Sequence, residues 1–101
     1  MDGFSLTTPE QAAKDLAGRA KALRLAQGWK QITLAQRSGV SLASLRRFEE
    51  SGRISLQSLL DLAFALHRLD DFASLLKLPP ASSIAELEKA EKRPERKRGR
   101  L

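Results

Sequence analysis

Two adjacent arginines, Arg46 and Arg47, lie in the segment SLASLRRFEE at residues 41–50. An arginine side chain can donate two parallel hydrogen bonds to O6 and N7 of a guanine, the commonest specific contact in the major groove of DNA. If the segment is a helix with about 100° per residue, one of its sides is mainly basic and could contact the edges of DNA bases. That side carries Ala43, Arg46, Arg47 and Glu50.

The small and hydroxyl side chains nearby fit the same chemistry. Ala43 permits a close approach to base edges, and its methyl group can touch a thymine methyl. Leu42 could do the same or lie against a sugar, and Ser41 and Ser44 could contact phosphate or a base edge. The alternative is that the two arginines form a solvated surface with exposed ion pairs, for which Glu50 is a candidate partner.

Few other residues offer reactive chemistry. The chain of 101 residues has no cysteine and a single histidine, His67, so disulfides and thiolate or histidine metal sites are not expected. No pairing of a nucleophile with a base and no phosphate-binding loop is recognisable, so we expect neither an enzyme nor a bound cofactor. His67 is expected at the surface or in an interface.

The charge of the chain favours a polyanionic partner. The net charge is +6, and residues 1–80 and 81–101 each contribute +3, although the second part is much shorter. A basic surplus is typical of proteins that bind nucleic acid. The chain has no apolar run long enough to span a membrane and does not start like a signal peptide. We therefore expect a cytoplasmic protein without a membrane partner.

Short helices must position the basic side. The first is expected from Thr8, which can cap it, to near Gln27, where Gly28 ends it. A second short helix is expected over residues 30–37. Gly39 then supplies a sharp turn, because glycine tolerates a positive φ.

The basic helix and two further helices follow this turn. Ser41 can cap the basic helix, and Ser55 or Ser58 can begin the next one. Asp70 or Asp71 can cap a short fifth helix. That helix would hold Phe72, Leu75 and Leu76.

The pattern predicts an all-α fold of five helices in a helix-turn-helix domain at residues 8–78. A Pro-led linker and basic tail would follow at 79–101, with a weak helix at 83–92. Six of the residues from 92 to 100 are basic, so the tail could be a solvated end without structure, an arm that binds DNA phosphates or the minor groove, or a segment that binds a protein partner.

Residues 28–52, GWKQITLAQRSGVSLASLRRFEESG, resemble the Cro/cI-type (Xre) helix-turn-helix family. With the flanking helices, the resemblance covers about residues 14–76. It implies a five-helix, all-α domain that binds operator DNA, usually as a dimer. The matching residues are Gly28, Trp29, Gln31, Leu34, Ala35, Gly39, Val40, Ser41, Leu45, Phe48 and Glu49.

The resemblance also implies roles for individual residues. Gln31 would begin the second helix, touch a phosphate and support the basic helix, while Arg24 would form a partly buried pair with Glu49. Lys30 stands where a capping residue is usual, which implies a weaker cap. The resemblance and the helical wheel together give the candidate DNA-binding residues. These are Lys30, Gln31, Arg37, Ser41, Leu42, Ala43, Ser44, Arg46, Arg47 and Arg53.

Several apolar residues are expected in the core or in a dimer interface. Trp29 is expected to pack between helices, with base stacking as the alternative. The dimer interface is expected on the last two helices, between Leu62 and Leu76. Phe64, Leu66 and Phe72 are candidates for either the core or this interface.

A narrower resemblance involves residues 54–76, ISLQSLLDLAFALHRLDDFASLL, and the final RPERKRGR. These segments resemble the HipB-like regulators that pair with HipA-family kinase toxins. This resemblance implies an autoregulating repressor and antitoxin in the bacterial cytoplasm, associated with the nucleoid. Its partners would be operator DNA, a second copy of the chain, and a HipA-like kinase toxin or an associated antitoxin subunit. The alternatives are a stand-alone Xre-type regulator and a module that chiefly holds a kinase toxin complex.

Overall fold

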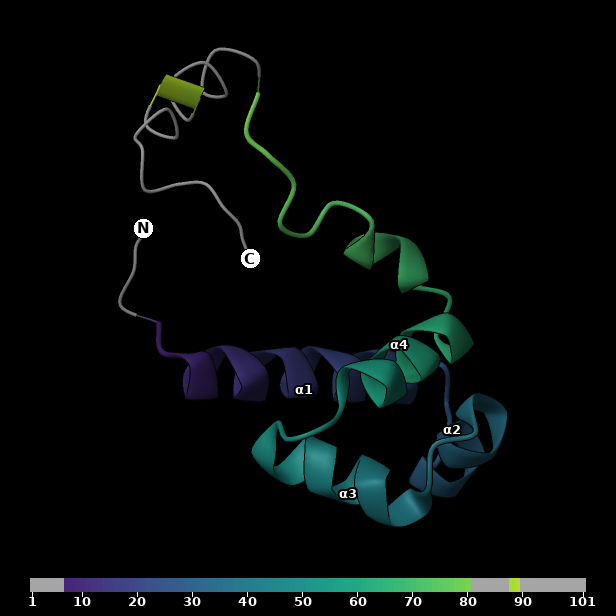
Figure 1. Cartoon of the computed structure of the whole chain (residues 1–101). Coiled ribbons are helices and arrows are strands. Elements are labelled where there is room, and N and C mark those ends of the chain that lie inside the picture. Colours follow the sequence, from purple (N-terminus) through teal and green to yellow (C-terminus); the bar gives the residue numbers. More distant parts are fainter. Residues whose placement is uncertain (1–6, 81–87, 90–101) are drawn as a thin grey trace.

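The computed structural model describes residues 7–80 and 88–89. Four α-helices, α1 to α4, are followed by a short 3-10 helix, η1, and no strand occurs in the described part of the chain. Figure 1 shows α3 beside α1, α2 at one end of this pair, and η1 beyond α4. The bounds are α1 Pro9–Ala26, α2 Gln31–Ser38, α3 Leu42–Ser51, α4 Leu56–Ala65 and η1 Leu69–Phe72.

Local signals fix the start and end of α1. The Thr8 hydroxyl accepts a hydrogen bond from the backbone N–H of Gln11 at 3.0 Å, and Pro9 occupies the first turn. The helix ends at Ala26, with Gln27 as its C-terminal cap. The predicted limits of this helix are therefore confirmed to within a residue.

The turn between α2 and α3 is tight. Lys30 precedes α2 without a side-chain capping hydrogen bond, as its side-chain chemistry predicts. Gly39 has φ +79° and donates its N–H to the carbonyl of Ala35, which ends α2. Val40, directly after the glycine, is buried and fills the space between the two helices.

Both ends of α3 are held closely. The Ser41 hydroxyl accepts a hydrogen bond from the N–H of Ser44, so the predicted cap is confirmed. At the other end Gly52 has φ +83°, and a Cβ built on it would lie only 2.7 Å from the backbone carbonyl carbon of Ala13 in α1. Only glycine combines this φ with this close approach.

One apolar cluster joins the four helices. Buried residues of α1, α2, α3 and α4 contact one another, and half-buried residues such as Trp29 and Ile54 pack around them. The cluster sits on the inner side of α3 and therefore fixes which way its other side points. Its buried members are Ala17, Leu34, Ala35, Val40, Leu45, Phe48, Leu62 and Leu66.

The predicted count of five α-helices is wrong. The segment expected to form the fifth helix is the 3-10 helix η1 followed by turns. No side chain caps η1: Arg68 stands at the cap position, and the expected caps Asp70 and Asp71 both lie inside η1. Asp71 forms an ion pair with Arg68, and His67 has φ +63°. Phe72 is half-buried, whereas Leu75 and Leu76 are exposed.

The predicted weak helix at 83–92 and the basic tail at 92–100 lie almost wholly outside the described residues. Of this region only Glu88 and Lys89 are described, and both are helical and exposed. Within the described residues, no helix is both long enough and apolar enough to cross a membrane.

Candidate nucleic-acid interface

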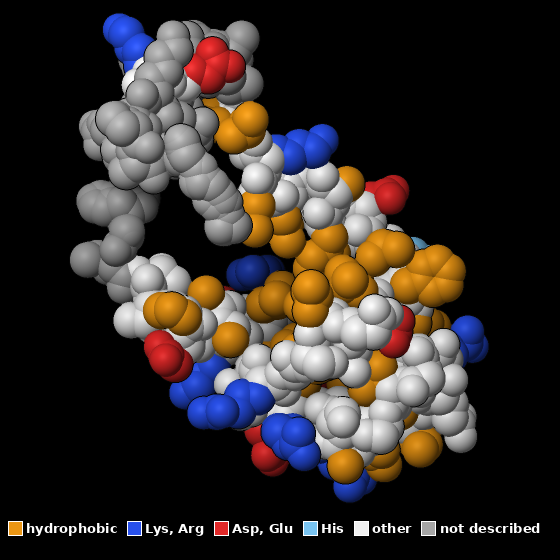
Figure 2. Space-filling view, in the orientation of Figure 1, with side chains coloured by type: hydrophobic (Ala, Val, Ile, Leu, Met, Phe, Trp, Pro, Cys, Tyr) orange, Lys and Arg blue, Asp and Glu red, His pale blue; other side chains and the backbone are white. Residues whose placement is uncertain are grey.

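The outer side of α3 is basic, and its arginines form no ion pair with the part of the chain that the structure describes. Leu45 and Phe48 face the core, each with 1% of its surface exposed, as the helical wheel predicts. Arg46 and Arg47 are exposed on the other side, and neither forms an ion pair with any residue that the structure describes. Glu50 lies on the same side but does not neutralise them. Figure 2 shows Lys and Arg side chains along the edge of the molecule that carries α3.

In the first turn of α3, three of the predicted DNA-binding residues also make contacts within the protein. The Ser41 hydroxyl accepts from the backbone N–H of Ser44 and donates a hydrogen bond to the Ser44 hydroxyl at 2.9 Å, so these two side chains are held together. Leu42 is half-buried and packs against the core. Ala43 is exposed, which leaves it as the small residue on the outer side of this turn.

A buried hydrogen-bond network fixes α3 to α1 and α2. The Arg24 guanidinium donates to Glu49 through Nε at 2.8 Å and through Nη2 at 3.0 Å. Its third nitrogen donates to the carbonyl oxygen of Trp29 at 2.8 Å. The Gln31 side-chain amide donates to the same Glu49 carboxylate at 2.9 Å. The side chains of Arg24 and Glu49 are only 7% and 5% exposed, so both buried charges have a partner.

The network also determines the charge state of Glu49. Burial by itself would raise the pKa of this carboxyl group. The hydrogen bonds from Arg24 and Gln31, together with the positive charges of Arg24 and Lys21, outweigh burial and lower the pKa below the ordinary value of 4.5. Glu49 is therefore ionised at neutral pH and acts as the counter-charge of Arg24.

The predicted basic residues around α3 lie at three different places. Lys30 is exposed immediately before α2. Arg37 is exposed near the end of α2, where its guanidinium lies 4.5 Å from the centre of the Trp29 ring in a cation–π contact. Arg53 is exposed just after α3. All three remain free to approach phosphate groups beside the helix.

Some supporting contacts were not predicted. The Ser51 hydroxyl donates to the carbonyl of Arg47 at 2.7 Å and accepts from the backbone N–H of Arg53 at 3.2 Å. Ser51 thus ties the backbone at Arg47 to the backbone at Arg53. A serine followed by glycine at a helix end is a local signal for such a turn, but the carbonyl of Trp29 as a partner of Arg24 has no signal in the sequence.

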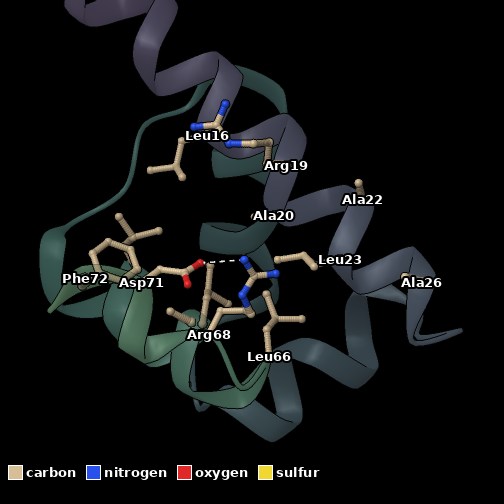
Figure 3. A pocket seen from close by; sticks show the side chains of 13 residues that line it. Leu16, Arg19, Ala20, Ala22, Leu23, Ala26, Leu66, Arg68, Asp71 and Phe72 are labelled. Carbon is tan, nitrogen blue, oxygen red and sulfur yellow. Dashed lines mark ion pairs between the residues drawn. The ribbon is translucent and has the colours of Figure 1, made fainter. Parts of the chain in front are cut away.

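A groove lies away from the basic side of α3. It has a volume of about 470 Å³ and is lined by α1, α4 and the segment around η1, with no residue from α2 or α3. Figure 3 shows Leu16, Leu23, Leu66 and Phe72 on its walls and the ion pair between Arg68 and Asp71, at 2.9 Å. The groove is mostly apolar and does not contribute to the candidate DNA-binding surface.

Comparison with known proteins supports the helix-turn-helix prediction. Residues 21–68 match the family model described as Helix-turn-helix, of the Xre type. This stretch contains α2, α3 and α4, the turn at Gly39 and the whole Arg24–Glu49 network. No curated protein and no solved structure matches the chain. The matched part of the chain is similar to helix-turn-helix domains, and this similarity supports a DNA-binding transcription regulator.

Proposed function

We propose that this chain is a sequence-specific transcription repressor that inserts α3 into the major groove of its operator. The observation that carries this proposal is the exposed pair Arg46 and Arg47, unpaired among the described residues, on a helix whose inner side is fixed by buried contacts. A rigid helix holds its side chains in one position relative to the bases, which direct base recognition requires.

Each part of the surface has a proposed task. Arg47, and Arg46 beside it, donate to O6 and N7 of guanine. Ala43 lies against a thymine methyl. Lys30 and Arg53, at the edges of the surface, bind phosphates and so set the position of α3 on the duplex. Ser41, Leu42 and Ser44 lie at the end of α3 that would enter the groove.

Two further candidate residues combine binding with support. Gln31 begins α2 and donates to Glu49, so it supports α3 and presents the start of α2 to a phosphate. The guanidinium of Arg37 rests on Trp29, which restricts its position while leaving its N–H groups available to phosphate. The pair Arg24 and Glu49 is structural and does not touch DNA.

A homodimer is part of the proposal. One reading helix of ten residues is about 15 Å long and covers only a few base pairs. Two copies on half-sites about 34 Å apart double the contacted sequence and make the operator a palindrome.

The biological setting we propose is an autoregulating antitoxin of the HipB-like kind. The support is the resemblance of residues 54–76 and of the basic end of the chain to those regulators. In this setting a HipA-like kinase toxin, or an associated antitoxin subunit, would bind the same chain. A stand-alone Xre-type regulator fits the helix-turn-helix match equally well. Co-purification with the product of a neighbouring gene separates the two, because only the antitoxin has such a partner.

The DNA-binding proposal is tested by selecting sites from a random duplex pool and then measuring affinity. We expect one enriched palindrome for the wild-type protein. The variant Arg47→Ala should lose about 1 to 3 kcal/mol of binding free energy and relax the preference at one base position in each half-site.

The matched control is Arg19→Ala, which removes the same charge from an exposed residue of the α1 groove wall. This control should keep the wild-type base preference. Unchanged affinity and specificity of Arg47→Ala would show that Arg47 does not read a base, and the absence of any enriched sequence would overturn the proposed function.

A further inference from the structure

Exposed apolar side chains are concentrated in one part of the molecule. Eight large apolar residues are exposed among the described residues, and six of them lie between residues 56 and 78. Figure 2 shows apolar side chains gathered over α4 and η1. The six residues are Leu56, Phe64, Leu69, Leu75, Leu76 and Leu78.

The helix α4 is apolar on two of its sides. Leu59, Leu62 and Leu66 face the core and the groove. A second row, Leu56, Leu60 and Phe64, repeats every four residues and spans about 80° of the helix surface. Leu56 is 67% exposed, Phe64 is 71% exposed and Leu60 is half-buried. We call this row, Leu56–Leu60–Phe64, the α4 stripe.

The α4 stripe is separate from the groove. None of its three residues lines the groove. On the adjacent side of α4, the side-chain amide of Gln57 donates to the Asp61 carboxylate at 3.0 Å, which gives the stripe a polar border. The stripe itself contains no charged residue. An apolar row with a polar border is typical of a helix face that packs against a protein.

We propose that the α4 stripe is the surface on which a second copy of this chain packs, with the two α4 helices crossing at Leu60 near a two-fold axis. The inference rests on the homodimer of the proposed function and deepens it by naming its interface.

Symmetry favours a second copy as the occupant. Across a two-fold axis a surface must be complementary to itself. Leu56 and Phe64 are both four residues from Leu60, so in an antiparallel crossing each would meet the other type of side chain on the second copy. Rows with a four-residue repeat are those that interlock in the commonest helix-packing class. Because the stripe is uncharged, the axis brings no like charges together.

The interface extends beyond the stripe. A stable interface buries about 800 Å² on each partner, which is more than three side chains supply. Leu69 and Leu75, which follow α4 in the chain and are also exposed, are the proposed additional apolar residues of the interface. The range Leu62 to Leu76 predicted for the interface includes Phe64, Leu69 and Leu75, but its members Leu62 and Leu66 are buried within the chain and belong to the core.

The first test measures molar mass without DNA, by sedimentation equilibrium over a range of concentrations. We expect the wild-type protein to be a dimer and Phe64→Glu to be a monomer, with a dissociation constant at least roughly 30-fold higher. Leu25→Glu is the control, because Leu25 is similarly exposed, at 57%, but lies on α1. This control should remain dimeric. A monomeric wild type, a dimeric Phe64→Glu, or equal loss in both variants would overturn the proposal.

The second test uses the absence of cysteine in the chain. Under mild oxidation, Leu60→Cys should form a disulfide-linked dimer in high yield. A disulfide joins Cα atoms that are about 4.4 to 6.8 Å apart, and the two copies of residue 60 would lie this close where the helices cross. Leu25→Cys should stay monomeric on a non-reducing gel. Equal cross-linking of both variants, or none with Leu60→Cys, contradicts a crossing at Leu60.

DNA binding separates this inference from the proposed function. If α4 carries the interface, Phe64→Glu should still bind a single half-site with wild-type base preference and lose affinity only for the full palindrome. A wild-type dimer that selects no sequence would overturn the function and leave the interface standing. A monomer that selects a sequence would overturn the interface and leave the function standing. A Phe64→Glu variant that binds the palindrome as tightly as the wild type counts against the interface.

Discussion

Glu49 is the residue on which the position of α3 depends. Its carboxylate accepts hydrogen bonds from Arg24 in α1 and from Gln31 in α2, so three helices meet at one side chain. A buried ion pair adds little net stability when complete, but losing one partner leaves an uncompensated charge and costs about 3 kcal/mol or more. Removal of Glu49 would therefore destabilise the protein mainly because the buried charge of Arg24 would lose its partner.

Acid should weaken this contact. The pKa of Glu49 is lowered in the folded protein, so its contribution to stability is fully present above the unfolded-state value of 4.5 and is lost as the pH falls through the folded value. At pH 7 we expect Glu49→Gln to be about 3 kcal/mol less stable than the wild type. The difference should shrink below pH 4.5, as measured by urea unfolding at several pH values. A difference that stays constant down to pH 3 would show that Glu49 does not titrate in this way.

At this scale the sequence was informative only in part. The wheel placed Leu45 and Phe48 in the core because helical spacing alone decides their side. The pairing of Arg24 with Glu49 came from the family resemblance. The Trp29 carbonyl as a third partner was not predictable, because backbone atoms have no sequence signal and meet distant side chains only after folding.

Among the elements, α3 lies very close to α1 where α3 ends. Gly52 adopts a left-handed φ and passes so close to Ala13 that no side chain fits. The helix that carries Arg46 and Arg47 is therefore seated directly on α1, and any shift of its last turn would also move the start of the path to α4.

A pair of glycine variants separates conformation from space. Gly28 has nearly the same φ, +77°, but no atom lies within 4 Å of an added Cβ. We expect Gly28→Ala to cost about 1 to 2 kcal/mol of unfolding free energy. Gly52→Ala should cost at least about 3 kcal/mol, because displacement of the α1 backbone is added. Thermal and urea unfolding would measure both. Equal losses would mean that the contact with Ala13 is relieved without cost.

The starts of three helices were predictable because each depends on a capping side chain close to its partner in the sequence. Thr8, Ser41 and Ser55 each accept from an N–H three residues ahead, and these caps could be read from short stretches of sequence. The fifth α-helix was not correctly predicted: Asp70 and Asp71, the two expected caps, both lie inside η1, and Asp71 forms an exposed ion pair with Arg68. Which of several nearby residues begins a helix is not decided by the local sequence alone.

On the scale of the whole molecule, basic and apolar surfaces lie on different elements. The candidate DNA surface involves α2, α3 and the residues beside them, whereas the groove and the α4 stripe involve α1, α4 and η1. The sequence predicted part of this division, because it placed the DNA-binding candidates at residues 30–53 and the apolar interface on the last two helices. It did not single out the α4 stripe, because α4 has leucines on two sides and periodicity alone does not show which side is exposed.

Phosphate contacts should appear as salt dependence. We expect Lys30→Ala and Arg53→Ala each to reduce the slope of log affinity against log salt by roughly 1 without changing the base preference. Arg19→Ala should leave the slope unchanged, since Arg19 lies on the groove wall. Titrations of the selected palindrome at several salt concentrations would provide the slopes. A changed base preference in Arg53→Ala would instead place that residue at a base edge.

The Arg24–Glu49–Gln31 network contacts only the inner side of α3, and this affects which residues of the helix can change. The contacts that hold α3 use its inner side, while Ala43, Arg46, Arg47 and Glu50 are exposed and their side chains form no hydrogen bond or ion pair among the described residues. Those four positions can therefore be exchanged for another set without loss of the scaffold. On the proposed function, changing these four residues would retarget the protein to a new operator, whereas α3 could not be transplanted alone, because Arg24 of another helix helps to fix its orientation.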